Sequence, residues 1–406
     1  MKGLMKYLSP FAPDISGAVS VFFRLGGVSV ILDAGGCTGN ACGFDEPRWF
    51  SQKSAVFSAG LRDLDAILGR DRMTLDKTAE VLERFDANFL AIIGTPVPAV
   101  IGTDFYGLMK EAGRRFRIPV AAVETNGMDL YDRGASRAYL ELVRIAAAKT
   151  GRKEGDGDAA IHTGDGAPVA VFGCTPLDFA PGDDSDKIRA GIQKAYPGNE
   201  IMIIGDDFAD LEKLPFAAVS IVTAPSGLAA AKEMERRWKI PWRAEYPEGG
   251  AICDPVRARN HSGGRTLIVH QAVFAAALAR RIRKEDETAA VRTATFFECP
   301  PDIGADGCMR LKDEEDFIRL VSEHSFDRIY ADPLLERACR GCCAEFIPLP
   351  HFAVSGSAAA QAAGRGMSST EQGMSSTGRG MSSTEQGGSA AKSGETARRW
   401  SRMEER

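Results

Sequence analysis

Two cysteines stand on a glycine-rich turn that follows an apolar run near the start of the chain. Residues 31–49 contain Cys37 and Cys42 together with Gly35, Gly36, Gly39 and Gly43. Thiolates bind soft metals and iron–sulfur clusters, and glycines let the backbone come close to a bulky ligand. The local pattern supports two interpretations equally: a turn that binds a cluster, and a tight turn with two inert buried thiols.

A second predicted strand end also has a composition suited to ligand binding. Residues 94–104 pass from an apolar strand through a proline-punctuated turn into a helix, whose first amides can face a ligand. Thr103 and Asp104 are also ordinary N-cap residues, which is the simpler interpretation. Because doubly wound sheets bind ligands at the carboxyl ends of their strands, this turn and the cysteine turn are both candidate sites.

The remaining motifs specify no further site. Cys339 and Cys342 have a C-x-x-C spacing, but no second such pair completes a zinc site, so helix-packing thiols are the default interpretation. Cys299, Cys308 and His351 are the residues that would complete one. His270 is expected at a strand-to-helix turn as a satisfied structural residue. The sequence has no Walker A, G-x-S-x-G or H-E-x-x-H motif, so nucleotide hydrolysis by this chain alone is not expected.

Strand and helix patterns alternate along the chain and predict an α/β fold with parallel sheets. The predicted strands cover 19–25, 28–32, 89–94, 119–123, 169–172, 201–204, 219–222, 266–269, 293–297, 328–330 and 345–349. The predicted helices cover 54–69, 75–85, 104–116, 134–149, 185–196, 226–238, 271–283 and 314–324. Both candidate turns therefore follow predicted strands directly.

Polar, glycine-rich segments divide these elements into three doubly wound, Rossmann-like domains around a central cleft. The predicted boundaries are 1–150, a linker at 151–166, 167–262 with a hinge at 249–264, and 263–356. In the tail, residues 357–406, Gly-Met-Ser-Ser-Thr recurs at positions 366, 373 and 380. We predict disorder there, with at most a frayed helix at 397–406, because too little apolar surface offsets the ordering entropy.

The composition limits the environment and the partners. The formal net charge of −5 gives no basic footprint for nucleic acid. No apolar run reaches the roughly 20 residues of a membrane span, and the N-terminus has no signal-peptide core. We therefore expect a cytoplasmic protein whose nine cysteines are thiols or metal ligands rather than disulfides.

Taken in order, several segments resemble the nitrogenase component 1 family, which includes the molybdenum–iron protein subunits, their cofactor-assembly scaffolds and the dark-operative protochlorophyllide reductase subunits. The resemblance covers roughly residues 9–356. The segments that carry it are Ser16-Gly17-Ala18, Leu25-Gly26-Gly27-Val28, Gly36-Cys37, Asp63 to Gly69, Thr95 to Asp104 and Ile240-Pro241-Trp242. The version of the motif around Cys37 looks like that of a divergent branch.

Departures from the family pattern decide what carries over. Pro96 occupies the slot of a cluster-ligand cysteine, and Phe11 to Pro13 holds no cysteine where the family has one. Thr223 falls where a catalytic subunit places the cysteine of its metal cofactor, and His351 lies near the family's histidine ligand with the register shifted by one. Dinitrogen reduction by this chain is therefore not expected.

The resemblance implies a redox subunit that takes electrons from an ATP-dependent iron–sulfur reductase to reduce an unknown small-molecule substrate. Cys37 and Cys42, with Asp33 and Asp45 as further candidates, would supply half the ligands of a 4Fe–4S cluster shared with a homologous subunit. Binding around the cofactor is expected from Gly35, Gly36, Gly39, Thr95 and Gly102. The alternatives are a non-catalytic metallocofactor carrier or assembly scaffold, and a metal-free small-molecule binding protein of the same fold.

Overall fold

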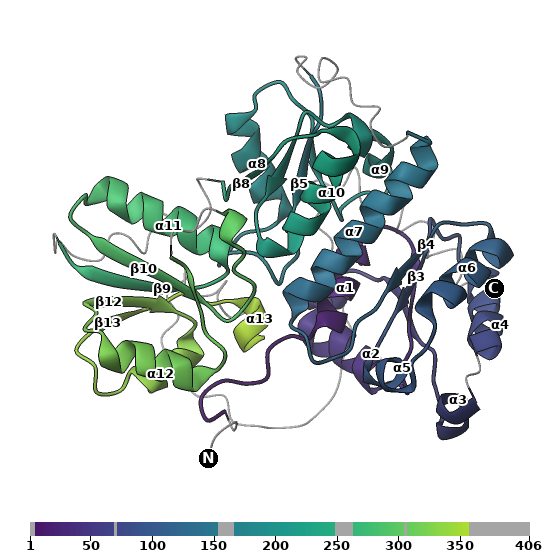
Figure 1. The fold of residues 1–406 in the computed structure, drawn as a ribbon, viewed down its shortest axis with the longest axis horizontal. Coiled ribbons are helices and arrows are strands. Elements are labelled where there is room, and N and C mark those ends of the chain that lie inside the picture. The colour runs from purple at the N-terminus through teal and green to yellow at the C-terminus, as the bar shows by residue number, and fades with distance from the viewer. Residues whose placement is uncertain (1–4, 69–70, 153–165, 248–262, 304–306, 357–406) are drawn as a thin grey trace, which may run out of the picture. The chain divides into compact units, whose positions relative to one another are not determined.

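Three parallel sheets flanked by helices make up the computed structural model of this chain, which describes residues 5–68, 71–152, 166–247, 263–303 and 307–356 (Figure 1). The predicted fold class is therefore confirmed. Each sheet is central to one α/β unit, and its strands run through apolar residues because helices cover both faces.

The first sheet has the strand order β2-β1-β3-β4, all parallel. Its strands are β1 (Val28–Ile31), β2 (Ala55–Ser58), β3 (Leu90–Ile93) and β4 (Val120–Val123). The connecting helices are α2 (Gly36–Asn40), η1 (Ala41–Asp45), η2 (Pro47–Phe50), α3 (Asp63–Leu68), α4 (Asp71–Leu82), α5 (Pro96–Ile101) and α6 (Phe105–Phe116). The strand order reverses between β1 and β3, so the cysteine turn after β1 stands at the topological switch point.

The second sheet repeats this topology in the order β6-β5-β7-β8. Its strands are β5 (Val169–Phe172), β6 (Ile201–Ile203), β7 (Val219–Val222) and β8 (Trp242–Ala244). The helices are α8 (Ser185–Ala195), α9 (Asp210–Lys213), η3 (Leu214–Phe216), η4 (Pro225–Gly227) and α10 (Leu228–Trp238).

The third sheet has five parallel strands in the order β11-β10-β9-β12-β13. They are β9 (Arg265–Val269), β10 (Ala290–Thr295), β11 (Met309–Arg310), β12 (Arg328–Ala331) and β13 (Glu345–Pro348). Its helices are α11 (Ala272–Glu285), η7 (Pro301–Ile303), α12 (Glu314–Glu323), η8 (Pro333–Cys339) and α13 (Phe352–Ser355).

Two helices lie outside this sheet-by-sheet scheme and cross each other closely. They are α1 (Asp14–Phe22) and α7 (Tyr131–Thr150). The prediction of a strand at 19–25 is therefore wrong, because Val19 to Phe22 form the last turns of α1. All nine residues of α1 are buried, so its apolar run lacks the 3.6-residue alternation that marks a half-exposed helix.

The predicted helix at 54–69 is also wrong in its first part. Residues 55–58 form β2, which lies at the edge of the first sheet and is only half-buried. The short edge strands β8 and β11 are absent from the predicted set of strands. Edge strands bury less surface than central ones, so their sequences show a weaker pattern.

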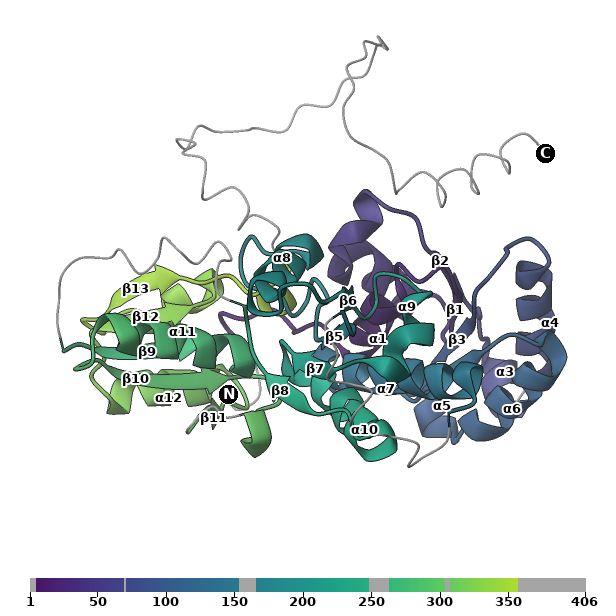
Figure 2. The same ribbon diagram turned by 90° about the horizontal axis from the view of Figure 1, so that it is seen from above.

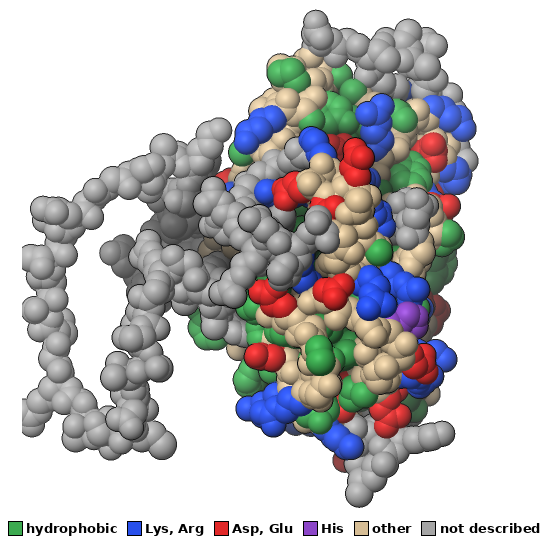
Figure 3. All heavy atoms as spheres, turned by 90° about the vertical axis from the view of Figure 1, so that its left-hand side faces the viewer, with side chains coloured by type: hydrophobic (Ala, Val, Ile, Leu, Met, Phe, Trp, Pro, Cys, Tyr) green, Lys and Arg blue, Asp and Glu red, His purple; other side chains and the backbone are tan. Residues whose placement is uncertain are grey.

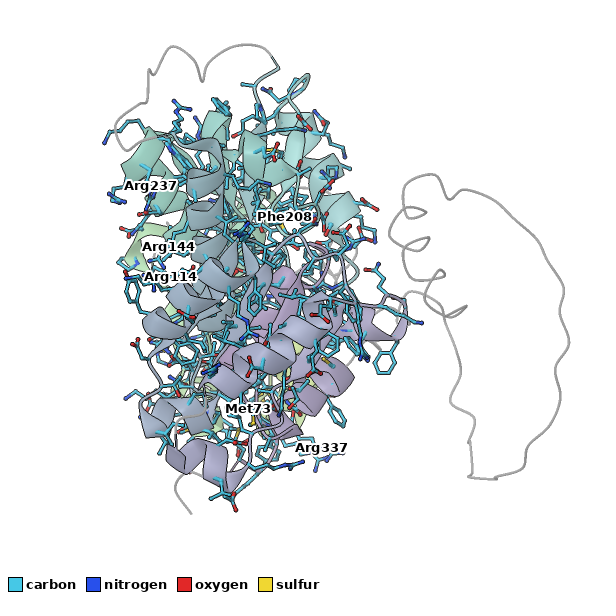
Figure 4. The ribbon with its side chains drawn as sticks, turned by 90° about the vertical axis from the view of Figure 1, so that its right-hand side faces the viewer. Met73, Arg114, Arg144, Phe208, Arg237 and Arg337 are labelled. Atoms are coloured by element: carbon cyan, nitrogen blue, oxygen red, sulfur yellow. The ribbon has the colours of Figure 1, made fainter. Side chains whose placement is uncertain are left out.

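A continuous core joins the first and second α/β units. The ring of Phe89, next to β3, stacks on that of Phe208 from the loop after β6, with 5.4 Å between centroids and 5° between planes. Phe208 is labelled in Figure 4. Helix α7 contacts β4, η4 and α10, and Figures 1 and 2 both show it running beside α10.

Several predictions fall on residues outside the described part of the chain. These are most of the linker at 151–166, most of the hinge at 249–264, and the tail at 357–406. Among the described residues, no helix is long and apolar enough to cross a membrane. On the face in Figure 3, Lys and Arg side chains are interspersed with Asp and Glu and do not gather into one basic patch.

Candidate functional site

The segment that we call the cysteine turn leaves the carboxyl end of β1, but instead of the predicted tight turn it forms two short helices, with Cys37 in α2 and Cys42 in η1. Gly35 has a φ of 118°, which strongly favours glycine, and this residue begins the turn. At Gly36 and Gly39 a Cβ atom would meet nothing within 4 Å. The backbone of this turn is therefore open on the side where these two glycines lie.

The two thiols differ in exposure. Cys37 is half-buried and packs against the core that joins the first two units, whereas Cys42 is buried. Burial, reinforced by Asp33, raises the pKa of Cys37, and burial with Glu46 raises the pKa of Cys42 to about 11. Both are neutral thiols at pH 7, so metal binding here must displace protons.

The two carboxylates named as further ligand candidates already accept hydrogen bonds. Asp33 accepts from the Thr38 amide at 2.8 Å, the Thr38 hydroxyl at 3.0 Å and the Ser58 hydroxyl at 2.6 Å. Asp45 accepts from the Ser16 hydroxyl at 2.6 Å and the Asn40 amide group at 3.0 Å. These contacts fix the turn to β2 and α1.

A buried ion pair holds the far end of the turn. Glu46 is almost fully buried and pairs with Arg48 at 2.7 Å, and Arg48 donates to the Ser20 carbonyl of α1 at 2.6 Å. The ion pair compensates the cost of burying the Glu46 carboxylate, and the contact of Arg48 with Ser20 anchors η2 to α1. Phe44 and Phe50, on either side of this pair, are 73% and 81% exposed.

Thr95 and Gly102 bound the neighbouring turn after β3. The Thr95 hydroxyl donates to the Leu32 carbonyl at 2.7 Å and accepts from the Val97 amide, so it ties the ends of β1 and β3 together. Gly102, with a φ of 69°, ends α5. Asp104 caps α6 through the Gly107 amide, in agreement with the simpler interpretation of that residue.

Within the described ranges, no group of three or more His, Cys, Asp or Glu side chains is arranged to hold a metal ion. The turn thus offers two thiols and two carboxylates that are engaged elsewhere. A cubane cluster normally has four cysteine ligands, so this chain supplies at most half of that set.

A second cluster of polar side chains lies buried where the three sheets meet. His270 follows β9, and its ring stacks on that of His351 with 4.1 Å between centroids. The Nε2 atom of His351 lies 2.8 Å from the Leu177 carbonyl, and Tyr131 at the start of α7 packs edge-on against the same ring. Asp178 accepts from Thr175 and from Ser226 at 3.0 Å. We name this the junction cluster: Tyr131, Asp178, His270 and His351.

Burial controls the charge of the junction cluster. It lowers the pKa of His351 to about 4 and, together with the charge of His351, lowers that of His270 well below its usual value. Neither nitrogen of His270 forms a hydrogen bond of normal geometry within the described part of the chain, so its position is as expected but it is not a satisfied residue. The cavity lined by both histidines and Asp332 measures about 10 Å³, roughly the room that one water molecule needs.

Thr223, where the family pattern has a cofactor cysteine, is a structural residue in this cluster's neighbourhood. Its hydroxyl donates to the Phe172 or the Gly173 carbonyl, at 3.0 and 2.7 Å, and lies 3.4 Å from the Cys174 thiol. Sequence reasoning missed Cys174, Tyr131 and Asp178. Their positions after β5 and at the start of α7 were a usable signal, since strand ends collect ligand-binding residues.

Sequence and structure are both similar to one family of proteins. The family model described as "Nitrogenase component 1 type Oxidoreductase" matches residues 14–253. A solved structure titled "Nitrogenase Cp1 at pH 6.5" matches with a TM-score of 0.61 and 11% identity, covering 86% of this chain and 87% of that one. Another, "Nitrogenase Cp1 at pH 5", has a TM-score of 0.59, 14% identity and coverage of 86% and 85%. At such identities the structural likeness shows the fold alone. No curated protein sequence matches this chain.

Proposed function

Since this chain belongs to the nitrogenase component 1 type oxidoreductases, we propose that it is a redox subunit that shares an iron–sulfur cluster with a homologous subunit. The carrying observation is the pair Cys37 and Cys42 on an open glycine turn at the switch point of the first sheet. Members of this family typically bind metal–sulfur clusters.

The residues present fit half of a cluster site and no more. Two thiols on one turn can supply two of four ligands, and the nearby carboxylates are already occupied by hydrogen bonds. A second copy or a homologous subunit placed against the turn would supply the rest. When bound, the cluster would carry single electrons, while Gly36 and Gly39 leave the backbone space for it.

An apolar rim beside the turn supports the position of this interface. The rim consists of Phe44, Phe50, Val100 and Met128, all exposed: Phe44 and Phe50 lie in η1 and η2 after the cysteines, and Val100 and Met128 on the segments that follow β3 and β4. Large exposed apolar side chains are a feature of protein interfaces. We further propose that an ATP-dependent iron–sulfur reductase supplies the electrons, in the cytoplasm, for reduction of a small molecule.

A metallocofactor carrier or assembly scaffold is the second candidate, and the filled junction favours it. The cavity at the junction cluster has room for about one water molecule, and Thr223 replaces a ligand thiol beside it. Neither the small cavity nor Thr223 provides a catalytic centre at this place. A subunit that only held a cluster at its interface would not need a catalytic centre there.

The test is anaerobic purification of the full chain, alone and co-expressed with a homologous subunit, followed by iron, sulfide and visible-absorption measurements. We expect stoichiometric iron and sulfide with a broad band near ~400 nm, typical of thiolate-bound clusters. Cys37→Ser and Cys42→Ser should each remove most of the iron. Cys343→Ser, which changes an exposed thiol, should keep it.

Each result decides between the candidates. Iron-free protein in both preparations, or full iron content in Cys37→Ser, would reject the cluster assignment. If iron is present, reduction of a small substrate by the chain with its reductase identifies an enzyme. Transfer of the cluster to another protein without turnover identifies a carrier. Asp33→Asn should keep its iron, because the contacts of that carboxylate are structural.

A further inference from the structure

Two cysteines meet at the edge of the third sheet, far in sequence from the cysteine turn. Cys299 follows β10 and Cys308 precedes β11, and these strands pair with Thr295 opposite Arg310. The pairing brings the ends of the loop 299–308 together. The Cys299 thiol donates to the Cys308 carbonyl oxygen, with 3.5 Å between Sγ and O, which places the Cys299 sulfur beside Cys308.

The surroundings of the two sulfurs make them chemically unequal. The neighbouring Cys308 side chain, and then the charge of Arg310, lower the pKa of Cys299. The neighbouring Cys299 side chain and burial raise the pKa of Cys308. Arg310 pairs with Glu298 at 3.2 Å and so stays beside the loop. A more acidic thiol next to a less acidic one is the arrangement of an attacking and a resolving cysteine.

Cys339 and Cys342, two further cysteines of the third α/β unit, provide a comparison. Cys339 at the end of η8 is buried, and burial with its neighbour Cys342 raises its pKa to about 12. A neutral, buried thiol is a poor nucleophile. Cys339 and Cys342 therefore form an internal comparison for Cys299 and Cys308.

We propose that Cys299 and Cys308 form a redox-active dithiol that exchanges with small disulfides formed by low-molecular-weight thiols. The proposal uses none of the residues assigned to the cluster and does not depend on the proposed function. It is a thiol modification site of the third α/β unit, at an exposed sheet edge where both β11 residues face solvent.

The exchange has two balanced steps. The Cys299 thiolate attacks one sulfur of the small disulfide, which forms a mixed disulfide and releases one thiolate. The Cys308 thiol then loses its proton and attacks the Cys299 sulfur, which closes the protein disulfide and releases the second thiolate. Two electrons pass from the pair to the small disulfide, and the two released thiolates take up the two protons.

The test uses the reduced full chain with glutathione disulfide at pH 7, alkylation at timed intervals, and mass spectrometry of the peptides. We expect a Cys299–Cys308 disulfide to form at least tenfold faster than any product at Cys339. Cys308→Ser should instead accumulate a mixed disulfide on Cys299. Cys299→Ser should form neither product, and Cys343→Ser should leave the rate at Cys299 unchanged.

Two results would overturn the proposal. One is modification of Cys299 in Cys308→Ser no faster than that of Cys339. The other is a wild-type disulfide that joins a different pair. Circular dichroism of each variant checks its fold, and disulfide mapping of the wild-type chain tests the pairing even if a variant does not fold. Iron content has no bearing on either outcome.

Discussion

At the scale of single residues, the cysteine turn is held by polar groups whose partners outside the turn lie on two segments, β2 and α1. Asp33 connects α2 to β2, Asp45 connects η1 to α1, and Glu46 with Arg48 connects η2 to α1. A buried carboxylate is tolerated only when such contacts compensate its desolvation. The thiols are thus held in place before any ligand arrives.

Burial of the two junction histidines has a consequence for stability against pH. In the folded protein the pKa values of both histidines lie below the usual 6.5, and that of His351 is about 4. The unfolded chain therefore binds more protons between pH 6.5 and pH 4, and stability from this source is lost as the pH falls through that window. Burial raises the pKa of Asp132 to about 6, so the contribution of Asp132 to stability changes with pH in the opposite direction.

His351→Gln should remove one part of this pH dependence. The wild-type free energy of unfolding should fall relative to that of the variant by about 3 kcal/mol between pH 6.5 and pH 4, since one pKa unit corresponds to about 1.36 kcal/mol. Urea unfolding of both proteins at several pH values measures the difference, in which the shared contributions of Asp132, Asp178 and Asp332 cancel. Parallel curves for the two proteins would contradict the assignment.

At the scale of elements, the crossing of α1 and α7 positions the first unit against the other two. The backbones come so close that a Cβ on Gly134 would lie 1.7 Å from the Asp14 carbonyl oxygen, and one on Gly17 would lie 1.9 Å from that of Tyr131. Tyr131 belongs to the junction cluster, and Asp14 accepts from the Asn126 and Gly127 amides. The crossing therefore connects α1, to which the cysteine turn is hydrogen-bonded, with α7, which begins at the junction cluster.

Gly134→Ala should destabilise the fold by about 3 kcal/mol or more, because the added methyl group meets backbone and the helices must separate. Gly113→Ala is the matched control: it lies in α6 with nothing within 4 Å of its Cβ, and should stabilise by roughly 0.5–1 kcal/mol. Thermal or urea unfolding reports both changes. Equal stability of the two variants would show that the crossing is not tightly packed.

At the scale of the whole molecule, the apolar rim and the half-complete ligand set point to the same conclusion. Phe44 and Phe50 remain exposed although the neighbouring turn is anchored by one buried ion pair and by hydrogen bonds. Two large exposed aromatic side chains close in sequence to a site with two ligands are explained if a second subunit covers them.

Replacing the rim aromatics by charge should therefore dissociate the protein and remove its iron together. We expect Phe44→Asp and Phe50→Asp to shift the sedimentation coefficient to that of a monomer of 43.6 kDa. Phe216→Asp changes an exposed phenylalanine of η3 in the second unit and should leave the assembly intact. A wild-type protein that is monomeric both alone and when co-expressed with a homologous subunit would contradict the shared cluster.

The sequence by itself determined the α/β class, the parallel sheets and most central strands. Central strands such as β3 and β5 are buried on both faces, so they appear as uninterrupted apolar runs between turn residues. It also placed Cys37 and Cys42 directly after the first strand of the sheet, although they lie in the short helices α2 and η1 and not on the predicted tight turn. Helix α6 was predicted from its own amphipathic pattern, which is a local feature.

Only the tertiary structure decided what depends on distant neighbours. Residues 19–25 resemble a strand and form part of a helix, because α7 and the second unit bury every side of α1. The junction cluster joins Tyr131, Asp178, His270 and His351 from segments up to hundreds of residues apart, and Cys299 meets Cys308 through strand pairing. Local composition carries no signal for such contacts, since they are fixed by how the sheets pack.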